Sequence, residues 1–236
     1  AQTQALTTAQ AAAIETADLR SLTTANVVAL TTDQIVALTT SQTASLTTNQ
    51  IAALTTEQAA AMALDDVAAL TVLQIRALTS DNLAAMSSDQ LAAMAAVQIS
   101  MMTTAQIAAI GTEQLRNLST AQIASMTSSQ VAALTTTQVA ALQTAQVAAI
   151  EVQDLRAMST AQIASLTTEQ LPALTTGQAA ALTTAQVAAL TTEQLPSLQT
   201  ADLVGMSTAQ LAAIDAAKVS ALGTEPVSYT HLTLPT

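Results

Sequence analysis

The stretch LTTAQVAALTTEQLPS, residues 182–197, holds two consecutive copies of the eight-residue unit that fills this chain. The consensus of the unit is L-T-T-x-Q-[IVL]-A-A, and we number its positions one to eight from the leucine. Every eighth residue from Leu6 to Leu222 is Leu, Ile or Met, without an insertion or a deletion. Self-similarity at such a fixed period indicates a repeat architecture.

Two regular structures do not fit this period. The aliphatic positions one and six lie five residues apart, so on a β-strand they would face opposite sides. In one continuous α-helix eight residues turn through about 800°, so the apolar stripe would move by roughly 80° with each unit. A short helix in each octad does fit, because position six and the next position one are three residues apart and share a helical face.

Capping residues and charges independently favour short helices. Thr at positions two and three can cap the helix, and Gln at position five completes a capping box if position two is the cap. The pattern leaves open which of the two is the cap. All sixteen acidic residues lie at positions two, four or five, and Arg20, Arg76, Arg116 and Arg156 lie at position seven. This order suits a helix dipole. Pro172 and Pro196 at position seven also favour helices of one or two turns.

We therefore predict an all-α fold, a solenoid or superhelix of short helices with one helix for each eight-residue repeat. Positions one and six are expected to be buried, and positions two, four, five and seven to be more exposed. Each helix is too short to be stable alone, so stability should come from stacking. Small residues at position eight would let helices approach closely. Residues 1–225 show no internal boundary or linker and are predicted to form one array.

The last residues depart from the pattern. Val227–Thr236 reads VSYTHLTLPT, which resembles the translation of a widely used transposase sequencing adapter. Bases of the same adapter would account for Pro226 at a Gln position. We expect residues 226–236 to be a non-native tail, with the natural chain truncated at this end. His231 and Tyr229, the only His and the only Tyr, would then carry no function. Because the chain starts at Ala1 and shows no signal peptide, we also expect its natural N-terminus to be missing.

Composition excludes several classes of function. Five basic residues and a net charge of -11 provide little to neutralise phosphates, so nucleic acid is not an expected partner. Polar residues interrupt every octad, so no membrane insertion is expected. The chain has no Cys, which rules out disulfides and thiolate metal sites. Half of its residues are apolar, which favours folding over disorder.

The candidate chemical groups all have a structural explanation. Asp65, Asp66, Asp81 and Asp89 could act on a metal or a proton, but they occupy ordinary first-turn positions, so we interpret them as solvated helix starts. Ser and Thr residues are interpreted as caps, because no native His or Cys could complete a triad. Lys218 is an exception at position five. We predict no enzyme activity and no catalytic, cofactor-binding or metal-binding residue. Methionines at position one are interpreted as core residues, namely Met62, Met86, Met94, Met102, Met126, Met158 and Met206.

The units LTTEQLPAL, LTTAQVAAL and STAQIA resemble tandem repeats of large bacterial secreted or surface proteins. The resemblance covers Leu6–Thr224 and implies a secreted or cell-surface, adhesin-like or spacer setting. Two functions remain open. The array could be a non-enzymatic spacer or stalk, or it could be a binding module whose repeated Thr/Gln face contacts a glycan, a protein or ice. No sequence feature identifies the partner.

Overall fold

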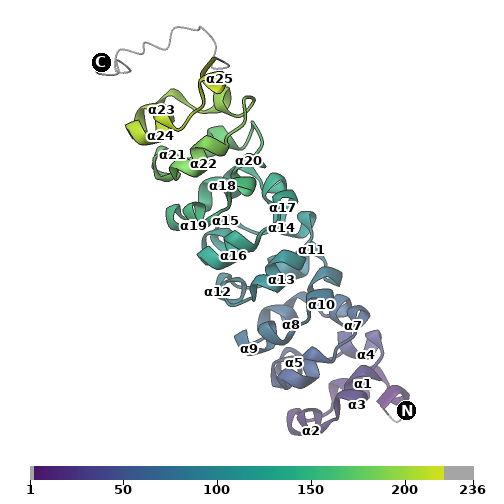
Figure 1. Cartoon of the computed structure of the whole chain (residues 1–236). Helices are drawn as coiled ribbons and strands as arrows, with labels where there is room; N and C mark the ends of the chain where they lie inside the picture. The colour runs from purple at the N-terminus through teal and green to yellow at the C-terminus, as the bar shows by residue number, and fades with distance from the viewer. Residues whose placement is uncertain (1–2, 221–236) are drawn as a thin grey trace.

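The computed structural model describes residues 3–220, and the elements in that part of the chain are short helices. Figure 1 shows them stacked into an elongated rod with the two ends of the chain at opposite tips. The predicted all-helical solenoid is confirmed. The elements are η1 (Thr3–Ala5), α1 (Thr8–Ala12), α2 (Thr16–Ser21), α3 (Thr24–Val28), α4 (Thr32–Val36), α5 (Thr40–Ser45), α6 (Thr48–Ala52), α7 (Thr56–Ala61), α8 (Leu64–Ala69), α9 (Val72–Ala77), α10 (Ser80–Ala85), α11 (Ser88–Ala92), α12 (Ala96–Ser100), α13 (Thr104–Ala109), α14 (Thr112–Arg116), α15 (Thr120–Ala124), α16 (Ser128–Ala133), α17 (Thr136–Ala141), α18 (Thr144–Ala149), α19 (Val152–Ala157), α20 (Thr160–Ala164), η2 (Leu171–Ala173), α21 (Thr176–Ala181), α22 (Thr184–Ala189), η3 (Leu195–Ser197), α23 (Thr200–Gly205), α24 (Thr208–Ala212) and α25 (Ala216–Val219).

The α-helices begin at position three of their octads, which makes position two the N-cap. Thr31 is typical: its Oγ1 accepts the Gln34 N–H at 3.2 Å, and its own N–H donates to Gln34 Oε1 at 2.8 Å. This is the predicted capping box, and it recurs in most octads. The choice between positions two and three, which the sequence left open, is thus decided for position two.

The helices from α1 to α24 end at position seven or eight, and the chain changes direction at position one. Leu78, for example, has φ -58° and ψ 137°, while its N–H still donates to Ile75 O at 3.2 Å. The octads with Pro172 and Pro196 form the 3₁₀ turns η2 and η3 instead of α-helices. The physical reason is that proline has no N–H to give to the carbonyl one helical turn earlier.

Successive octads wrap into superhelical turns. Helix α7 packs against α4 and α10, and the same spacing of three octads relates α13 to α10 and α16. Figure 1 shows these partners lying one above another along the rod. Helices inside the rod have neighbours in the turns on both sides. They can therefore bury aliphatic side chains that a single short helix would leave in water. Within the described residues, no helix has the length and apolar character that crossing a bilayer requires.

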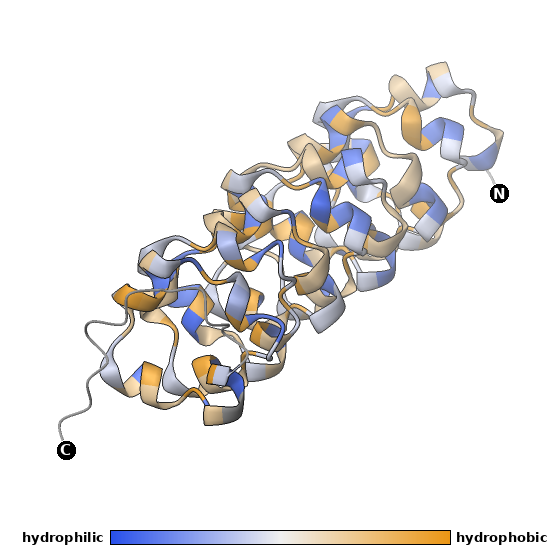
Figure 2. Cartoon of the chain, turned by 90° about the horizontal axis from the view of Figure 1, so that it is seen from above, coloured by the Kyte–Doolittle hydropathy of each residue, from blue (hydrophilic) through white to orange (hydrophobic). Residues whose placement is uncertain are grey.

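Positions one and six form a continuous core, as predicted. From Val27 and Leu30 onward, the aliphatic side chains at these positions are at least nine-tenths buried through Leu198. Leu6, Ile14 and Leu22 are only half-buried, because they lie in the first turn and have no turn beneath them. Figure 2 shows hydrophobic and hydrophilic segments alternating along the rod. The buried hydrophobic residues form one cluster from Leu19 to Ile214.

The prediction for position five is wrong. This position was expected to be relatively exposed, but Gln58, for example, is only 2% exposed, and Asp66 only 3%. Burial of a polar side chain costs free energy unless its hydrogen bonds are replaced. The glutamines meet this condition by bonding to the preceding turn. Position four, in contrast, is exposed in every octad from Ala9 to Ala209, as predicted.

The predicted non-native tail, residues 226–236, lies outside the described residues, and so do His231 and Tyr229. The domain boundary near residue 225 therefore stays a prediction.

Candidate functional site

The buried glutamines at position five form a ladder that joins each superhelical turn to the one before it. Gln58 Nε2 donates to Val27 O at 2.9 Å and to Leu30 O at 2.8 Å, which are 31 and 28 residues earlier. Its Oε1 accepts the N–H of its own cap, Thr55, at 3.0 Å. One side chain thus closes the helix start in its own turn and satisfies two carbonyl oxygens of the turn below. We call this repeated arrangement the glutamine ladder.

The ladder begins in the second superhelical turn, because glutamines of the first turn have no earlier turn to bond to. Gln10, in the first turn, makes only its capping bonds and is exposed, whereas Gln34 is the first to reach back, to Leu6 O at 2.6 Å. The same bond to the residue 28 positions earlier is made by Gln34, Gln42, Gln50, Gln58, Gln74, Gln90, Gln98, Gln106, Gln114, Gln122, Gln130, Gln138, Gln146, Gln162, Gln170, Gln178, Gln186, Gln194 and Gln210.

Two other donors occupy position five in later turns. Asn82 is one methylene shorter than Gln, and its Nδ2 reaches Leu54 O at 2.9 Å, 28 residues earlier. Lys218 directs its ammonium group to Ala188 O at 2.5 Å, 30 residues earlier. Lys218, which departs from the Gln consensus, therefore also donates a hydrogen bond to the preceding turn.

Aspartates at position five interrupt the series of donors. Asp66, Asp154 and Asp202 are 3%, 2% and 1% exposed, so the expectation that Asp66 is a solvated helix start is wrong. Asp154 Oδ1 accepts the Ser128 hydroxyl at 2.5 Å, and Asp202 Oδ2 accepts the Gln199 N–H at 3.2 Å. Burial, and after it the negative charge of Asp65, raise the pKa of Asp66 from 3.8 to about 6.

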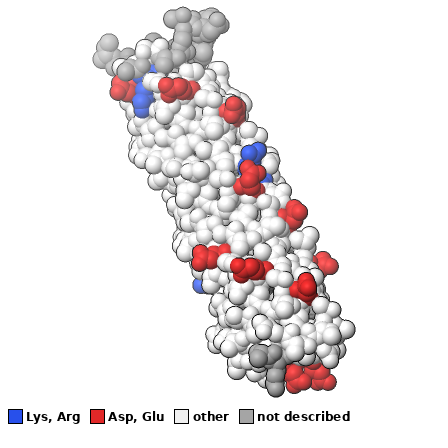
Figure 3. Space-filling view, turned by 90° about the vertical axis from the view of Figure 1, so that its right-hand side faces the viewer, with Lys and Arg blue, Asp and Glu red and all other residues white. Residues whose placement is uncertain are grey.

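The other three acidic candidates, Asp65, Asp81 and Asp89, are exposed, as predicted for helix starts. They lie at position four of α8, α10 and α11, and α8 packs on α11, which places Asp65 and Asp89 on adjoining turns. In residues 3–220 no three His, Cys, Asp or Glu side chains come together as a metal site would require. Figure 3 shows acidic side chains spaced along this face of the rod, with few basic groups among them.

The capping hydroxyls also act on nearby carboxylates. The Glu57 N–H holds the pKa of Glu57 below its ordinary value, and the Thr55 hydroxyl lowers it further. Glu193 is affected in the same way by its own N–H and by the hydroxyls of Thr191 and Thr192. These carboxylates are fully exposed, so they are solvated anions at helix starts.

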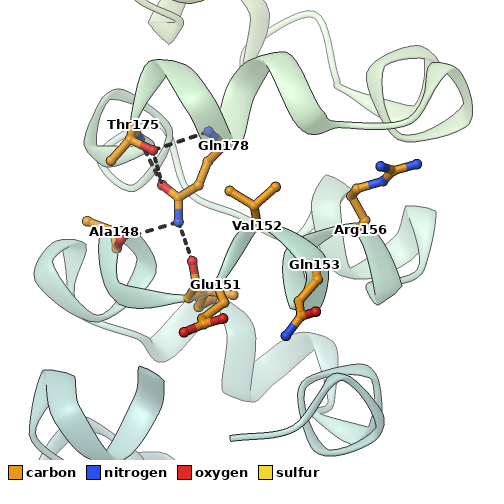
Figure 4. Close-up of a pocket in the computed structure, with 8 residues that line it drawn as sticks. Ala148, Glu151, Val152, Gln153, Arg156, Thr175 and Gln178 are labelled. Carbon is orange, nitrogen blue, oxygen red and sulfur yellow. Dashed lines mark hydrogen bonds between the residues drawn. The ribbon is translucent and has the colours of Figure 1, made fainter. Parts of the chain in front are cut away.

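A hollow of about 740 Å³ lies between the turn of α19 and the turn of α21. Its floor includes Ile150 and Val152, and Glu151 and Arg156 carry its charges. Figure 4 shows Gln178 beside this hollow with its amide hydrogen-bonded to the α18 end, so the ladder itself forms one wall. A smaller polar hollow of about 330 Å³ lies where Asn117 Nδ2 donates to Asp89 Oδ1 at 3.3 Å. Both are open surface depressions.

The remaining candidates lie where the sequence placed them. The position-one methionines from Met62 to Met206 are buried in the core. The four Arg side chains are exposed, and the ion pair found in the described part of the chain joins Arg116 Nη1 to Glu113 Oε1 at 3.9 Å. Ser and Thr hydroxyls at position two serve as caps, for example at Thr127 and Ser159.

The glutamine ladder is the feature that sequence reasoning missed. The available signal was Gln at position five in twenty of the twenty-eight octads, next to the buried position six. Capping explains the side-chain oxygen but gives no role to the amide nitrogen. A strictly repeated amide with an unassigned donor indicates a second partner, which the sequence alone could not place.

Comparison with known families agrees with this repeat structure. The model of a family described as the ALTTAQ repeat matches residues 11–48, 60–96, 107–144, 147–184 and 195–228, each segment spanning between four and five octads. Among curated proteins no match was found. The five matched segments cover well over half of the sequence, so the chain belongs to the ALTTAQ repeat family.

Proposed function

We propose that this array is a non-enzymatic spacer or stalk in a secreted or cell-surface bacterial protein. The observation that carries the proposal is the glutamine ladder, which continues from Gln34 to Gln210. Each turn is tied to the preceding one by buried amide hydrogen bonds and by the shared aliphatic core. An array in which every turn makes the same kind of contact with the preceding turn increases in length as octads are added.

The polar side chains of the octad support the same proposal. Gln at position five and Thr or Ser at position two are occupied by hydrogen bonds inside the fold, as Gln138 and Thr135 are. The groups that face solvent include eight acids at position four, between Asp33 and Glu193, and mostly small residues at position seven. A net charge of -11 favours solubility and separation from other copies.

The rod can be tested by deleting whole octads. Removing residues 102–125, three octads, joins position eight to position one and keeps the phase. Small-angle X-ray scattering should show the maximum dimension fall by roughly 8–10 Å, the spacing of packed helices. Removing residues 102–121 instead breaks the phase and should destabilise the array. A phase-preserving deletion that unfolds the chain, or leaves its length unchanged, would contradict a modular rod.

The spacer role requires a test in the complete gene product. Replacing the array by an unrelated rigid rod of equal length should preserve the activity of the flanking domains, and a shorter rod should reduce it. Protease treatment of intact cells, compared with lysed cells, tests surface exposure. Loss of activity with a rod of equal length would favour a binding function instead.

A second candidate function is binding through exposed threonines. Thr24 and Thr48, and farther along the rod Thr120 and Thr144, are exposed at position three of helices that pack on each other in pairs, α3 with α6 and α15 with α18. They are not the residues that cap their helices. The glutamines of the Thr/Gln face expected from the sequence are buried. The candidate face for a glycan, a protein or ice therefore consists of threonines alone. Replacing these threonines by alanine in groups should lower affinity in steps for a binding module and leave a spacer unaffected.

A further inference from the structure

Asp66 is a buried acid at a point where the fold needs a donor. At the equivalent position Gln58 and Gln74 donate to carbonyl oxygens 28 and 31 residues earlier. For Asp66 those carbonyls belong to Leu38 and Ile35. An ionised carboxylate has no proton to give, so it would bring its own lone pairs toward those of a carbonyl oxygen.

Asn82 provides the geometry for a side chain of this length. Asn and Asp have the same number of bonds from Cα to the terminal atom, and Asn82 Nδ2 lies 2.9 Å from Leu54 O. Asp66 occupies the equivalent position in α8, which packs on α5, so by this equivalence we expect one of its oxygens to lie at similar range from Leu38 O. That separation suits an O–H···O hydrogen bond, about 2.5–3.0 Å.

The other buried aspartates show why Asp66 differs. Asp154 receives the Ser128 hydroxyl and Asp202 receives the Gln199 N–H, so each carboxylate has a donor. In the described structure Asp66 has neither: its N-cap is Ala63, which has no hydroxyl, and no hydrogen bond reaches its carboxyl group. A proton is the simplest way to satisfy both Asp66 and Leu38 O.

We propose that Asp66 is protonated in the assembled array and donates its proton to Leu38 O, forming a joint between turns that tightens as the pH falls and loosens as Asp66 ionises.

The charges around Asp66 agree with this joint. Helix α5, which packs on α8, has no titratable side chain, and α11 on the other side has Asp89. Asp33 on α4, Glu57 on α7 and Arg76 on α9 are exposed. Neighbouring Asp65 adds negative charge. Burial, and then Asp65, raise the pKa of Asp66 from 3.8 to about 6. A pKa raised in the folded state favours the neutral acid there, so this contribution to stability is complete below pH 3.8 and is lost as the pH rises through 6.

Two measurements test the joint in the intact chain. Titration of the Asp66 carboxyl carbon by NMR should show a midpoint near pH 6. Amide hydrogen exchange in α8, corrected for the intrinsic pH dependence of the exchange reaction, reports how often the helix opens. Because the pKa of Asp66 is higher in the folded state, opening should be about tenfold more frequent at pH 7 than at pH 5. D66N keeps the size and carries a permanent donor, so its opening should stay infrequent at both pH values. D154N, which removes an acid that has its own hydroxyl donor, is the matched control and should leave the pH dependence in α8 unchanged.

Three results would overturn the proposal. The first is a midpoint near 4 for Asp66, and the second is opening in α8 that does not change between pH 5 and pH 7. The third is a joint that closes at pH 7 on addition of Ca²⁺ or K⁺ while Asp66 is ionised, which would make this a cation site. As a converse, Q98D places an acid against Leu70 O, now bonded at 2.6 Å, in a helix whose N-cap, Ala95, also has no hydroxyl, and should create a second joint with the same pH dependence. The spacer proposal does not depend on any of these outcomes.

Discussion

Replacing Gln138 by leucine removes one rung of the glutamine ladder at almost constant side-chain volume. Gln138 is 3% exposed. Its Nε2 donates to Ile107 O at 2.9 Å and to Ile110 O at 2.7 Å, and its Oε1 accepts the Thr135 N–H at 2.7 Å. Ile107 O keeps the backbone N–H of Ile110 as a partner. Ile110 O and the Thr135 N–H would lose the partners described here.

The expected cost follows from these three bonds. A hydrogen bond contributes about 0.5–1.5 kcal/mol net, and a buried group left without a partner costs about 1–3 kcal/mol. We therefore expect Gln138→Leu to lower the free energy of unfolding by about 3–5 kcal/mol. The midpoint of urea denaturation, followed by circular dichroism at 222 nm, measures the change. Hydrogen exchange should place the loss in α17 and in the turn below it, because a repeat array can open locally.

Two glutamines of the same chain are matched controls. Gln153 occupies exposed position four, so Gln153→Leu should change stability by no more than about 0.5 kcal/mol. Gln10 occupies position five of the first turn and makes only capping bonds, so Gln10→Leu should cost about 1 kcal/mol. Equal effects of Gln138→Leu and Gln10→Leu would refute the argument, because they would mean that the bonds between turns contribute nothing beyond the cap.

Two further predictions concern the core and the ladder. Leu134→Asp or Val139→Asp should lower the free energy of unfolding by several kcal/mol, because each change buries an unpaired charge where the native side chain is 4% or 0% exposed. The melting temperature measures the effect, with Thr137→Asp at exposed position four as the control. A shift no larger than that of the control would argue against the core role of Leu134 and Val139. Asn82→Gln should raise the free energy of unfolding by about 1 kcal/mol, because the longer side chain can also donate to Ile51 O, 31 residues earlier. An unchanged or lower midpoint of urea denaturation would show that this second hydrogen bond does not stabilise the array.

The ladder also explains how such short helices form a regular rod. A helix of five or six residues lies far below the length at which helices are stable in water. The capping box satisfies the first N–H groups of each helix, and the glutamine from a later turn satisfies carbonyl oxygens at its end. Both ends of α7, for example, have partners: the Thr55–Gln58 box at its start, and at its end Gln90, which donates to Ala59 O and Met62 O. At the end of α4 the equivalent residue is Asp66, which offers no permanent donor to the carbonyl oxygens there. That is why the Asp66 position is the sensitive one.

The sequence by itself determined the helical class, the octad as the structural unit and most of the core. Leu134 and Val139 could be assigned to the core because a spacing of three residues places aliphatic side chains on one helical face. The Thr pair at positions two and three and the acids at position four could be assigned to the helix start, because capping and the helix dipole act within one turn of chain. These are local interactions, and eight residues are enough to reveal them.

The tertiary structure decided the environment of position five. Whether Gln58 faces water or the carbonyls of Val27 and Leu30 depends on how many octads complete one superhelical turn, and no local rule fixes that number. The separation of 28 to 31 residues results from the packing of each helix on the helix three octads away. The same packing buries Asp66 and leaves Asp65 beside it in solvent, a difference between adjacent carboxylates that becomes visible only when the turn below is in place.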